Sequence, residues 1–75
     1  MIKVGQIRKD GDIAYVITKI WYNATTDKDW ADCVYYDGTT DQYSTWYIGE
    51  YHELIAEYPA WQEAVNSAEF RGEAR

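Results

Sequence analysis

Residues 13–22, IAYVITKIWY, constrain the fold of this chain more than any other segment. Nearly every side chain in this run is β-branched or aromatic, and such residues favour strands over helices. Shorter segments of similar character occupy residues 2–8, 30–36 and 42–48. Polar segments rich in Asp, Asn and Gly separate them and are typical of turns. The first 58 residues therefore predict four strands joined by tight connections.

The strand predicted over residues 30–36 has two unlike faces. A period of two places Ala31, Cys33 and Tyr35 on one face and Asp32 on the other. The face that carries Asp32 is the better candidate for solvent. Cys33 is then predicted to be a small buried apolar residue and not a reactive thiol. Neither face of residues 42–48 is polar enough to be assigned.

The pattern changes after residue 48. Residues 49–53 predict one helical turn, and residues 54–57 fit a fifth strand or a continued helix equally well. Pro59 is predicted at the first position of a helix over residues 60–69, with Gly72 as its stop. The helix carries an apolar stripe that we expect to pack on the sheet through its tryptophan: Trp61, Ala64, Val65 and Ala68.

Chain length limits the architecture. The 75 residues are enough for one small domain, with residues 1–58 as the sheet and residues 59–70 as the helix. A flat sheet of this size would leave its edges and half of its apolar surface in water. The expected fold class is therefore mainly β, a small antiparallel barrel of four or five strands with a C-terminal α-helix.

Several strings of residues resemble known proteins. The order of strands, the YYDG at residues 35–38 and the segment WYIGEYHELI at residues 46–55 resemble an SH3-like barrel, in which a 3₁₀ turn joins the last two strands. The segments KVGQI (residues 3–7) and AEYPAWQEAVNSAEF (residues 56–70) resemble small proteins of unknown function from bacteriophages and prophages of Gram-positive bacteria. The resemblance includes no catalytic motif and implies a fold and a source without an activity.

The numbers of His and Cys residues exclude most catalytic arrangements. His52 and Cys33 are the only residues of their kinds, so the chain has no internal disulfide, no two-histidine metal site and no histidine-bridged relay. A Cys33–His52 pair is disfavoured because Cys33 is expected in the core and His52 in a turn. Residues 27–38 have Asp32 and Gly38 where a calcium loop needs glycine and glutamate. We expect no enzymatic activity, no metal and no cofactor.

Charge is divided unevenly along the chain. The net charge is −6, with +2 over residues 1–26 and −8 over residues 27–75. An acidic protein repels the phosphate backbone of nucleic acids at long range. Acidity serves solubility in most proteins, and here it also fits contact with a basic protein surface.

Aromatic side chains are in excess for such a small barrel. Four Trp, eight Tyr and one Phe exceed what its interior can hold, so some rings must be exposed. Exposed Tyr and Trp mark contact surfaces, although cross-strand packing alone also explains tyrosines on strands. The candidate partner-binding residues are Trp21, Tyr22, Asp27, Asp29, Trp30, Asp32, Tyr36, Tyr43, Tyr47 and Tyr51.

These observations favour a non-enzymatic protein-binding module. Together with the resemblance, they indicate a phage-encoded protein that modulates or inhibits a host protein, such as a defence factor. The alternative is a nucleic-acid-binding barrel that uses exposed aromatics and a basic N-terminal segment, Lys3, Arg8, Lys9 and Lys19. Self-association is a third option. No apolar run approaches the roughly 20 residues that span a bilayer, and we expect a cytoplasmic protein.

Overall fold

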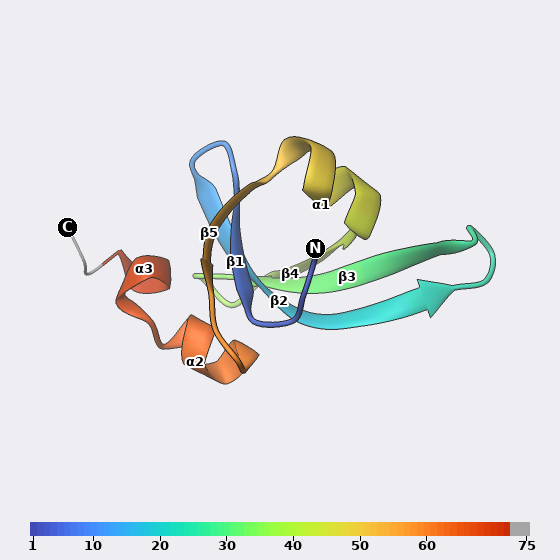
Figure 1. Cartoon of the computed structure of the whole chain (residues 1–75). Coiled ribbons are helices and arrows are strands. Elements are labelled where there is room, and N and C mark those ends of the chain that lie inside the picture. The colour runs from blue at the N-terminus through green and yellow to red at the C-terminus, as the bar shows by residue number, and fades with distance from the viewer. Residues whose placement is uncertain (73–75) are drawn as a thin grey trace.

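Five antiparallel strands form one sheet in the order β4-β3-β2-β1-β5. The computed structural model describes residues 1–72 (Figure 1). Its elements are β1 (Gln6–Asp10), β2 (Ile13–Asn23), β3 (Lys28–Tyr35), β4 (Thr40–Ser44), α1 (Thr45–Tyr51), β5 (Glu53–Glu57), α2 (Trp61–Val65) and α3 (Ala68–Arg71). Helix α1 connects the two edge strands, which do not pair with each other within the described residues. The mainly β, SH3-like architecture expected from the sequence is confirmed as an open barrel.

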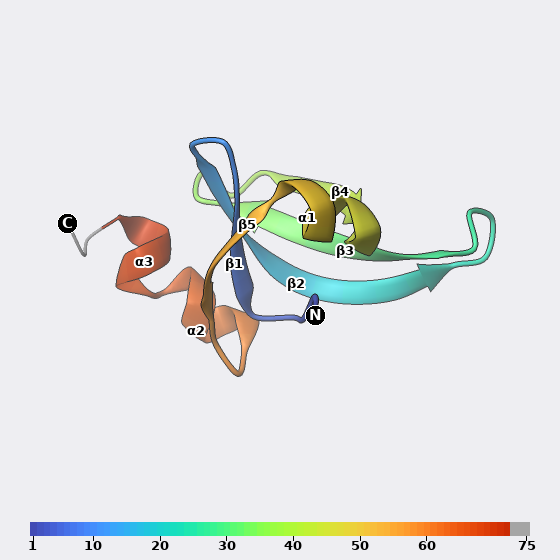
Figure 2. The same ribbon diagram turned by 45° about the horizontal axis from the view of Figure 1, so that its top comes forward.

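Both faces of the sheet are packed, which explains the continuous apolar run in β2. Tyr15 and Ile17 are fully buried on one face, where Ile48 of α1 covers them. Val16 points to the other face and packs with two residues from the C-terminal helices, Ala64 and Phe70. Helices α1 and α3 accordingly lie on opposite sides of β1 (Figures 1 and 2).

Strand β1 begins four residues later than the sequence predicts. Gly5 has a φ of 91°, donates its N–H to the carbonyl of Ile17 (2.9 Å) and accepts from the N–H of Tyr58 (3.1 Å). A Cβ at this position would lie 2.2 Å from the Tyr58 carbonyl oxygen. Only glycine fits a left-handed backbone at such a close approach. The chain therefore turns at Gly5, and residues 2–5 are not part of the strand.

The prediction of a strand over residues 42–48 is wrong in its second half. Ser44 ends β4 and caps α1, because its side-chain oxygen accepts from the N–H of Tyr47 at 3.2 Å. The β propensity of the residues that follow is overridden by the burial of Ile48 against the sheet. The helical turn predicted over residues 49–53 is thus displaced, with α1 covering residues 45–51. The question left open for residues 54–57 is answered by β5, which pairs with β1.

The C-terminal helix is interrupted. Ser67 separates α2 from α3, donating its hydroxyl to the Ala64 carbonyl (2.6 Å) and accepting from the N–H of Phe70 (3.2 Å). Pro59 does not open α2, whose N-cap is Ala60. The packing of Trp61 against the sheet is confirmed, and Gly72 caps α3 with a left-handed backbone (φ 74°). The break at Ser67 lets the Phe70 side chain turn into the core. One straight helix over residues 60–69 would not place it there.

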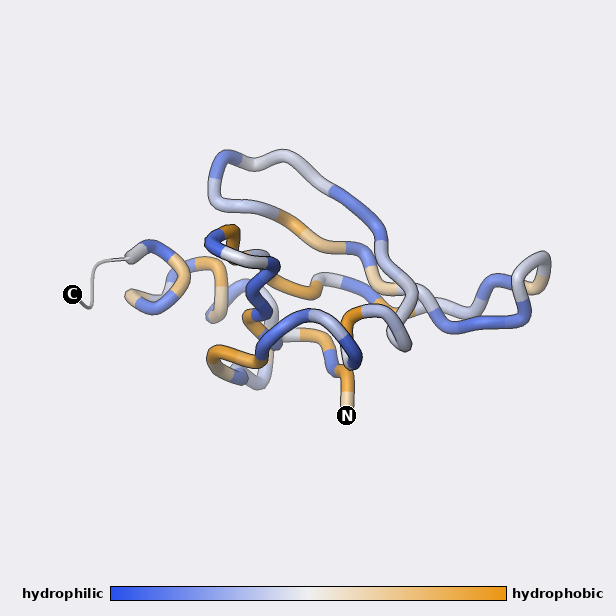
Figure 3. The backbone as a smooth tube through the Cα atoms, turned by 90° about the horizontal axis from the view of Figure 1, so that it is seen from above, coloured by the Kyte–Doolittle hydropathy of each residue, from blue (hydrophilic) through white to orange (hydrophobic). Residues whose placement is uncertain are grey.

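The outer part of the β2–β3 hairpin projects from the barrel. We call residues 21–30 the hairpin arm; it gives the chain its long dimension of 41 Å against 22 Å in the other two (Figure 1). Hydrophilic residues are frequent along the arm (Figure 3). Within residues 1–72, no helix is long and apolar enough to cross a lipid bilayer.

Candidate functional site

The structure divides the ten candidate residues among three regions. Six lie on the hairpin arm or at its base: Trp21, Tyr22, Asp27, Asp29, Trp30 and Asp32. Three belong to α1 or to the strand before it: Tyr43, Tyr47 and Tyr51. Tyr36 stands apart, with its ring 6.1 Å from that of Phe70 in α3. The arm and α1 adjoin, because the Thr45 hydroxyl donates to the Asp29 carbonyl (3.4 Å).

Helix α1 exposes three large rings, one of which, Tyr51, contacts both of the others. Trp46, Tyr47 and Tyr51 are 59%, 41% and 64% exposed. The Tyr51 ring centroid lies 6.0 Å from that of Trp46 and 4.9 Å from that of Tyr47. We call these three residues the α1 aromatic surface. Contiguous exposed rings on one short helix are the type of patch that marks a contact site.

A stack of rings anchors this surface to the core. Tyr47 stacks on Tyr43 with centroids 6.0 Å apart and planes within 6°, and Tyr43 stacks on the buried Tyr15 at 5.5 Å. The His52 ring meets Tyr43 and Tyr47 edge-on at 4.9 and 5.3 Å. Because inner members of the stack are held by packing, the exposed rings are preorganised, which lowers the entropy lost when a partner binds.

His52 packs against Tyr47 of the α1 aromatic surface and is only 4% exposed. Its Nδ1 is hydrogen-bonded to the Tyr15 hydroxyl at 2.7 Å, and its Nε2 lies 3.6 Å from a carboxylate oxygen of Asp10. His52 follows α1 directly, in the turn region where the sequence places it, but the expectation that it sits apart from the core is wrong. Its position at the end of α1 directs the ring inward, and no sequence pattern signals this.

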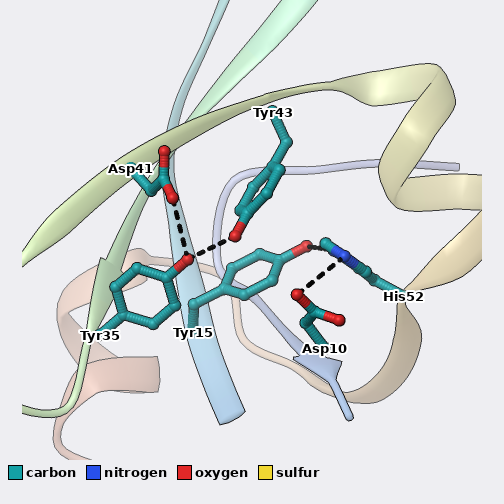
Figure 4. Close-up of polar contacts among 6 residues, drawn as sticks. All are labelled: Asp10, Tyr15, Tyr35, Asp41, Tyr43 and His52. Atoms are coloured by element: carbon teal, nitrogen blue, oxygen red, sulfur yellow. Dashed lines mark hydrogen bonds and ion pairs between the residues drawn. The ribbon is translucent and has the colours of Figure 1, made fainter.

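The other hydroxyls of the cluster serve as hydrogen-bonding groups. Tyr35 is bonded to the Tyr43 hydroxyl (2.5 Å) and donates to Asp41 (3.3 Å; Figure 4). Burial raises the pKa of Tyr15, Tyr35 and Tyr43 above the usual value for tyrosine. These hydroxyls stay protonated at neutral pH and are poor proton donors for acid–base chemistry.

Cys33 is buried, as the sequence predicts, and its thiol makes contacts separate from those of His52. Its sulfur lies 3.8 Å from the carbonyl oxygen of Ala31, whereas His52 contacts Tyr15 and Asp10. Burial raises the pKa of the Cys33 thiol to about 12. A nucleophile needs the thiolate, so this environment opposes reactivity. Among residues 1–72, no group of three His, Cys, Asp or Glu side chains is placed to hold a metal ion.

The two tryptophans of the arm contribute to its internal packing. Trp21 and Trp30 are half-buried cross-strand partners whose rings stack at 6.4 Å. The Trp21 indole N–H donates to Asp32 and that of Trp30 donates to Thr26, both at 2.9 Å. Tyr22, by contrast, is 60% exposed and bonds Asp27. Cross-strand packing therefore accounts for much of the arm's aromatic content.

Charges are segregated around these surfaces. Residues 29–70 contain nine acidic side chains and no Lys or Arg. In the basic N-terminal segment, Arg8 is buried and donates to the Gln6 side chain and the His52 carbonyl. It is therefore not on the surface that a nucleic acid would meet.

Trp46 is an exposed aromatic residue that sequence reasoning missed. Read as part of a strand, it falls on an unassigned face of residues 42–48. On a helix it follows Thr45 and precedes Tyr47, and its ring contacts that of Tyr51, five positions later. The signal that could have found it is Ser44, a preferred N-cap residue, directly before the run.

Comparisons of the chain with protein-family models, with curated proteins and with solved structures found no match. Fold and site together define a small, mainly β domain, an open five-stranded antiparallel sheet with an exposed aromatic helix.

Proposed function

We propose that this protein is a non-enzymatic module that binds another protein, with the α1 aromatic surface at the centre of the interface. The observation that carries the proposal is the contact among Trp46, Tyr47 and Tyr51 while each remains substantially exposed. Tyr and Trp are enriched among the hot spots of protein interfaces, because they bury a large area with few rotatable bonds.

The surrounding charges favour a partner with a basic surface. Asp29 lines a hollow together with Trp46, and Glu50 lies one helical turn after Trp46. Acidic side chains at the rim of an interface attract a basic partner and accelerate its association. The same charges oppose nucleic-acid binding.

The resemblance to small phage proteins leads us to propose a host protein as the partner. Binding would modulate or inhibit the host protein's function. A host defence factor with a basic, nucleic-acid-binding groove fits this surface in charge, since carboxylates would occupy the place of phosphates.

The test is capture of partners from a nuclease-treated lysate of a Gram-positive host, with three forms of the tagged protein. These are the unmodified chain, a Trp46→Ala/Tyr51→Ala variant and a Tyr36→Ala control. Tyr36 and Tyr51 are equally exposed, at 64%, and Tyr36 contacts α3 instead of α1. We expect a protein that the unmodified chain and the control retain in stoichiometric amount and the double variant loses.

Three other outcomes would contradict the proposal. Equal capture by all three forms would show that the α1 aromatic surface is not part of the interface. Capture only without nuclease treatment would support nucleic-acid binding. A mass that increases with concentration, with no captured protein, would indicate self-association.

A further inference from the structure

The hollow beside Trp46 combines an indole with a carboxylate. It has a volume of about 440 Å³ and is lined by Lys28, Asp29, Thr45 and Trp46. This volume lies at the lower end of the range for small-ligand sites, so it suits one side chain more than a large ligand. The Trp46 ring is the most apolar wall, and its 59% exposure leaves the indole accessible.

Among the residues that line the hollow, Asp29 supplies the one carboxylate, and Glu50 lies outside it, one helical turn after Trp46. Within residues 1–72, neither Asp29 nor Glu50 takes part in an ion pair. The Thr45 hydroxyl bonds the backbone carbonyl of Asp29 and leaves its carboxylate free for a ligand. A purely apolar group placed against Trp46 would desolvate the Asp29 carboxylate without compensation. A cation would compensate it.

Among cationic side chains, arginine fits these walls best. A guanidinium group is planar, weakly hydrated and able to stack on an indole face while it donates paired hydrogen bonds to a carboxylate. A lysine ammonium is strongly hydrated and cannot stack in this way. Lys28 is the one cation on the hollow, and its charge opposes any incoming cation.

We propose that the hollow between Trp46 and Asp29 binds an arginine side chain of the partner protein. The guanidinium stacks on the Trp46 indole and pairs with Asp29, while Glu50 adds attraction from the next helical turn. This inference rests on the proposed function and names the chemistry by which the α1 aromatic surface recognises its partner.

The test needs no identified partner, because blocked amino acids serve as probes. N-acetyl-arginine methylamide is titrated into the ¹⁵N-labelled full chain while the indole N–H signal of Trp46 is followed by NMR. The matched probes are the citrulline derivative, which keeps the shape without the charge, and the lysine derivative. We expect saturable shifts with arginine, binding about two- to fivefold weaker with lysine, and no saturation with citrulline.

Two charge variants test whether arginine binding depends on the charges at the hollow. Asp29→Asn should weaken arginine binding about two- to fivefold, whereas Lys28→Gln should strengthen it by a similar factor. Asp37→Asn, an exposed acid in the turn after β3, is the control and should change nothing. Retained peak dispersion shows that each variant is folded.

Equal binding of arginine and citrulline, or shifts confined to residues away from Trp46, would overturn the inference. So would unchanged affinity in both charge variants. Failure of the arginine titration together with Trp46-dependent capture from lysate would refute this inference alone. The opposite combination would refute the proposed function: arginine binds, but capture from lysate does not depend on Trp46.

Discussion

Buried hydroxyl groups hold the centre of the barrel at the level of single residues. The Tyr15 hydroxyl is the hydrogen-bond partner of His52 Nδ1. Tyr15→Phe leaves this buried nitrogen unpaired, so we expect the free energy of unfolding to fall by about 1–3 kcal/mol. Tyr22→Phe removes an exposed hydroxyl that bonds Asp27 and should cost less than about 0.5 kcal/mol. Urea denaturation measures both, and equal losses would contradict the structural role of Tyr15.

The thiol of Cys33 predicts how stability depends on pH. Burial raises its pKa from 9.0 to about 12, so the folded state holds the proton more tightly than the unfolded state. The resulting stabilisation is complete below pH 9 and is lost as the pH rises toward 12, by at most about 1.4 kcal/mol per pH unit. Burial of Tyr15 acts in the same direction at higher pH.

Cys33→Ala isolates the thiol contribution. The variant lacks the titrating group, so its unfolding free energy should decline less steeply than that of the unmodified chain between pH 9 and 10. Denaturation curves collected across this interval measure the two slopes. Parallel slopes would show that Cys33 titrates alike in both states.

At the scale of elements, the start of β1 depends on a backbone contact. Gly5→Ala would force a Cβ to within 2.2 Å of the Tyr58 carbonyl oxygen at a positive φ. We expect a loss of more than about 2 kcal/mol, since both strain and steric overlap oppose the change. Gly49→Ala in α1 meets no atom within 4 Å and should be neutral or stabilising by about 0.5–1 kcal/mol. Thermal denaturation ranks the two, and similar melting temperatures would contradict this account of β1.

Helices α2 and α3 form part of the hydrophobic core on the face of the sheet that contains Val16. They contribute Ala64 and Phe70 to the cluster that covers Ile7 and Val16. A chain truncated to residues 1–58 should lose its cooperative thermal transition, and Phe70→Ala should cost about 3–5 kcal/mol. Glu63→Ala, at an exposed site of α2, is the matched control. An equally cooperative calorimetric transition for the truncated chain would contradict the packing.

At the scale of the whole molecule, a net charge of −6 is spread over an elongated body with a projecting arm. Long-range attraction should therefore govern how fast a basic partner associates. We expect the association rate to fall about tenfold or more between low and high salt, with little change in dissociation. Surface plasmon resonance at several ionic strengths, once a partner is in hand, measures both rates. A salt-independent association rate would contradict the charge-complementary interface.

Reversal of charge on the arm should act on the same rate. Asp29→Lys changes an exposed carboxylate and should slow association while the thermal transition stays near its original temperature. Asp27 and Asp32 are left unchanged. Asp27 bonds Tyr22 and has a left-handed backbone (φ 55°), and Asp32 accepts hydrogen bonds from Trp21 and Gln42 that help to hold the arm.

The sequence by itself determined the features that arise from local chemistry. Strand propensity over residues 13–22 predicted β2, and Asp and Gly residues predicted the turns beside it. The alternation around Cys33 predicted which face of β3 is buried, and the stripe containing Trp61 predicted contact with the sheet. Each of these depends on neighbours within a few positions along the chain.

Only the tertiary structure decided where these local preferences are overridden. Residues 45–48 have strand propensity but form a helix, because Ile48 is buried on the sheet and Ser44 caps the turn. Gly5 ends a favourable alternation because Tyr58, 53 positions later, approaches its backbone. Trp46 and Asp29 share one hollow only after the barrel folds, and His52 is buried by rings from three other elements. Burial and long-range contact outweigh local propensities of a few tenths of a kcal/mol, and the proposed binding surface is built from such contacts.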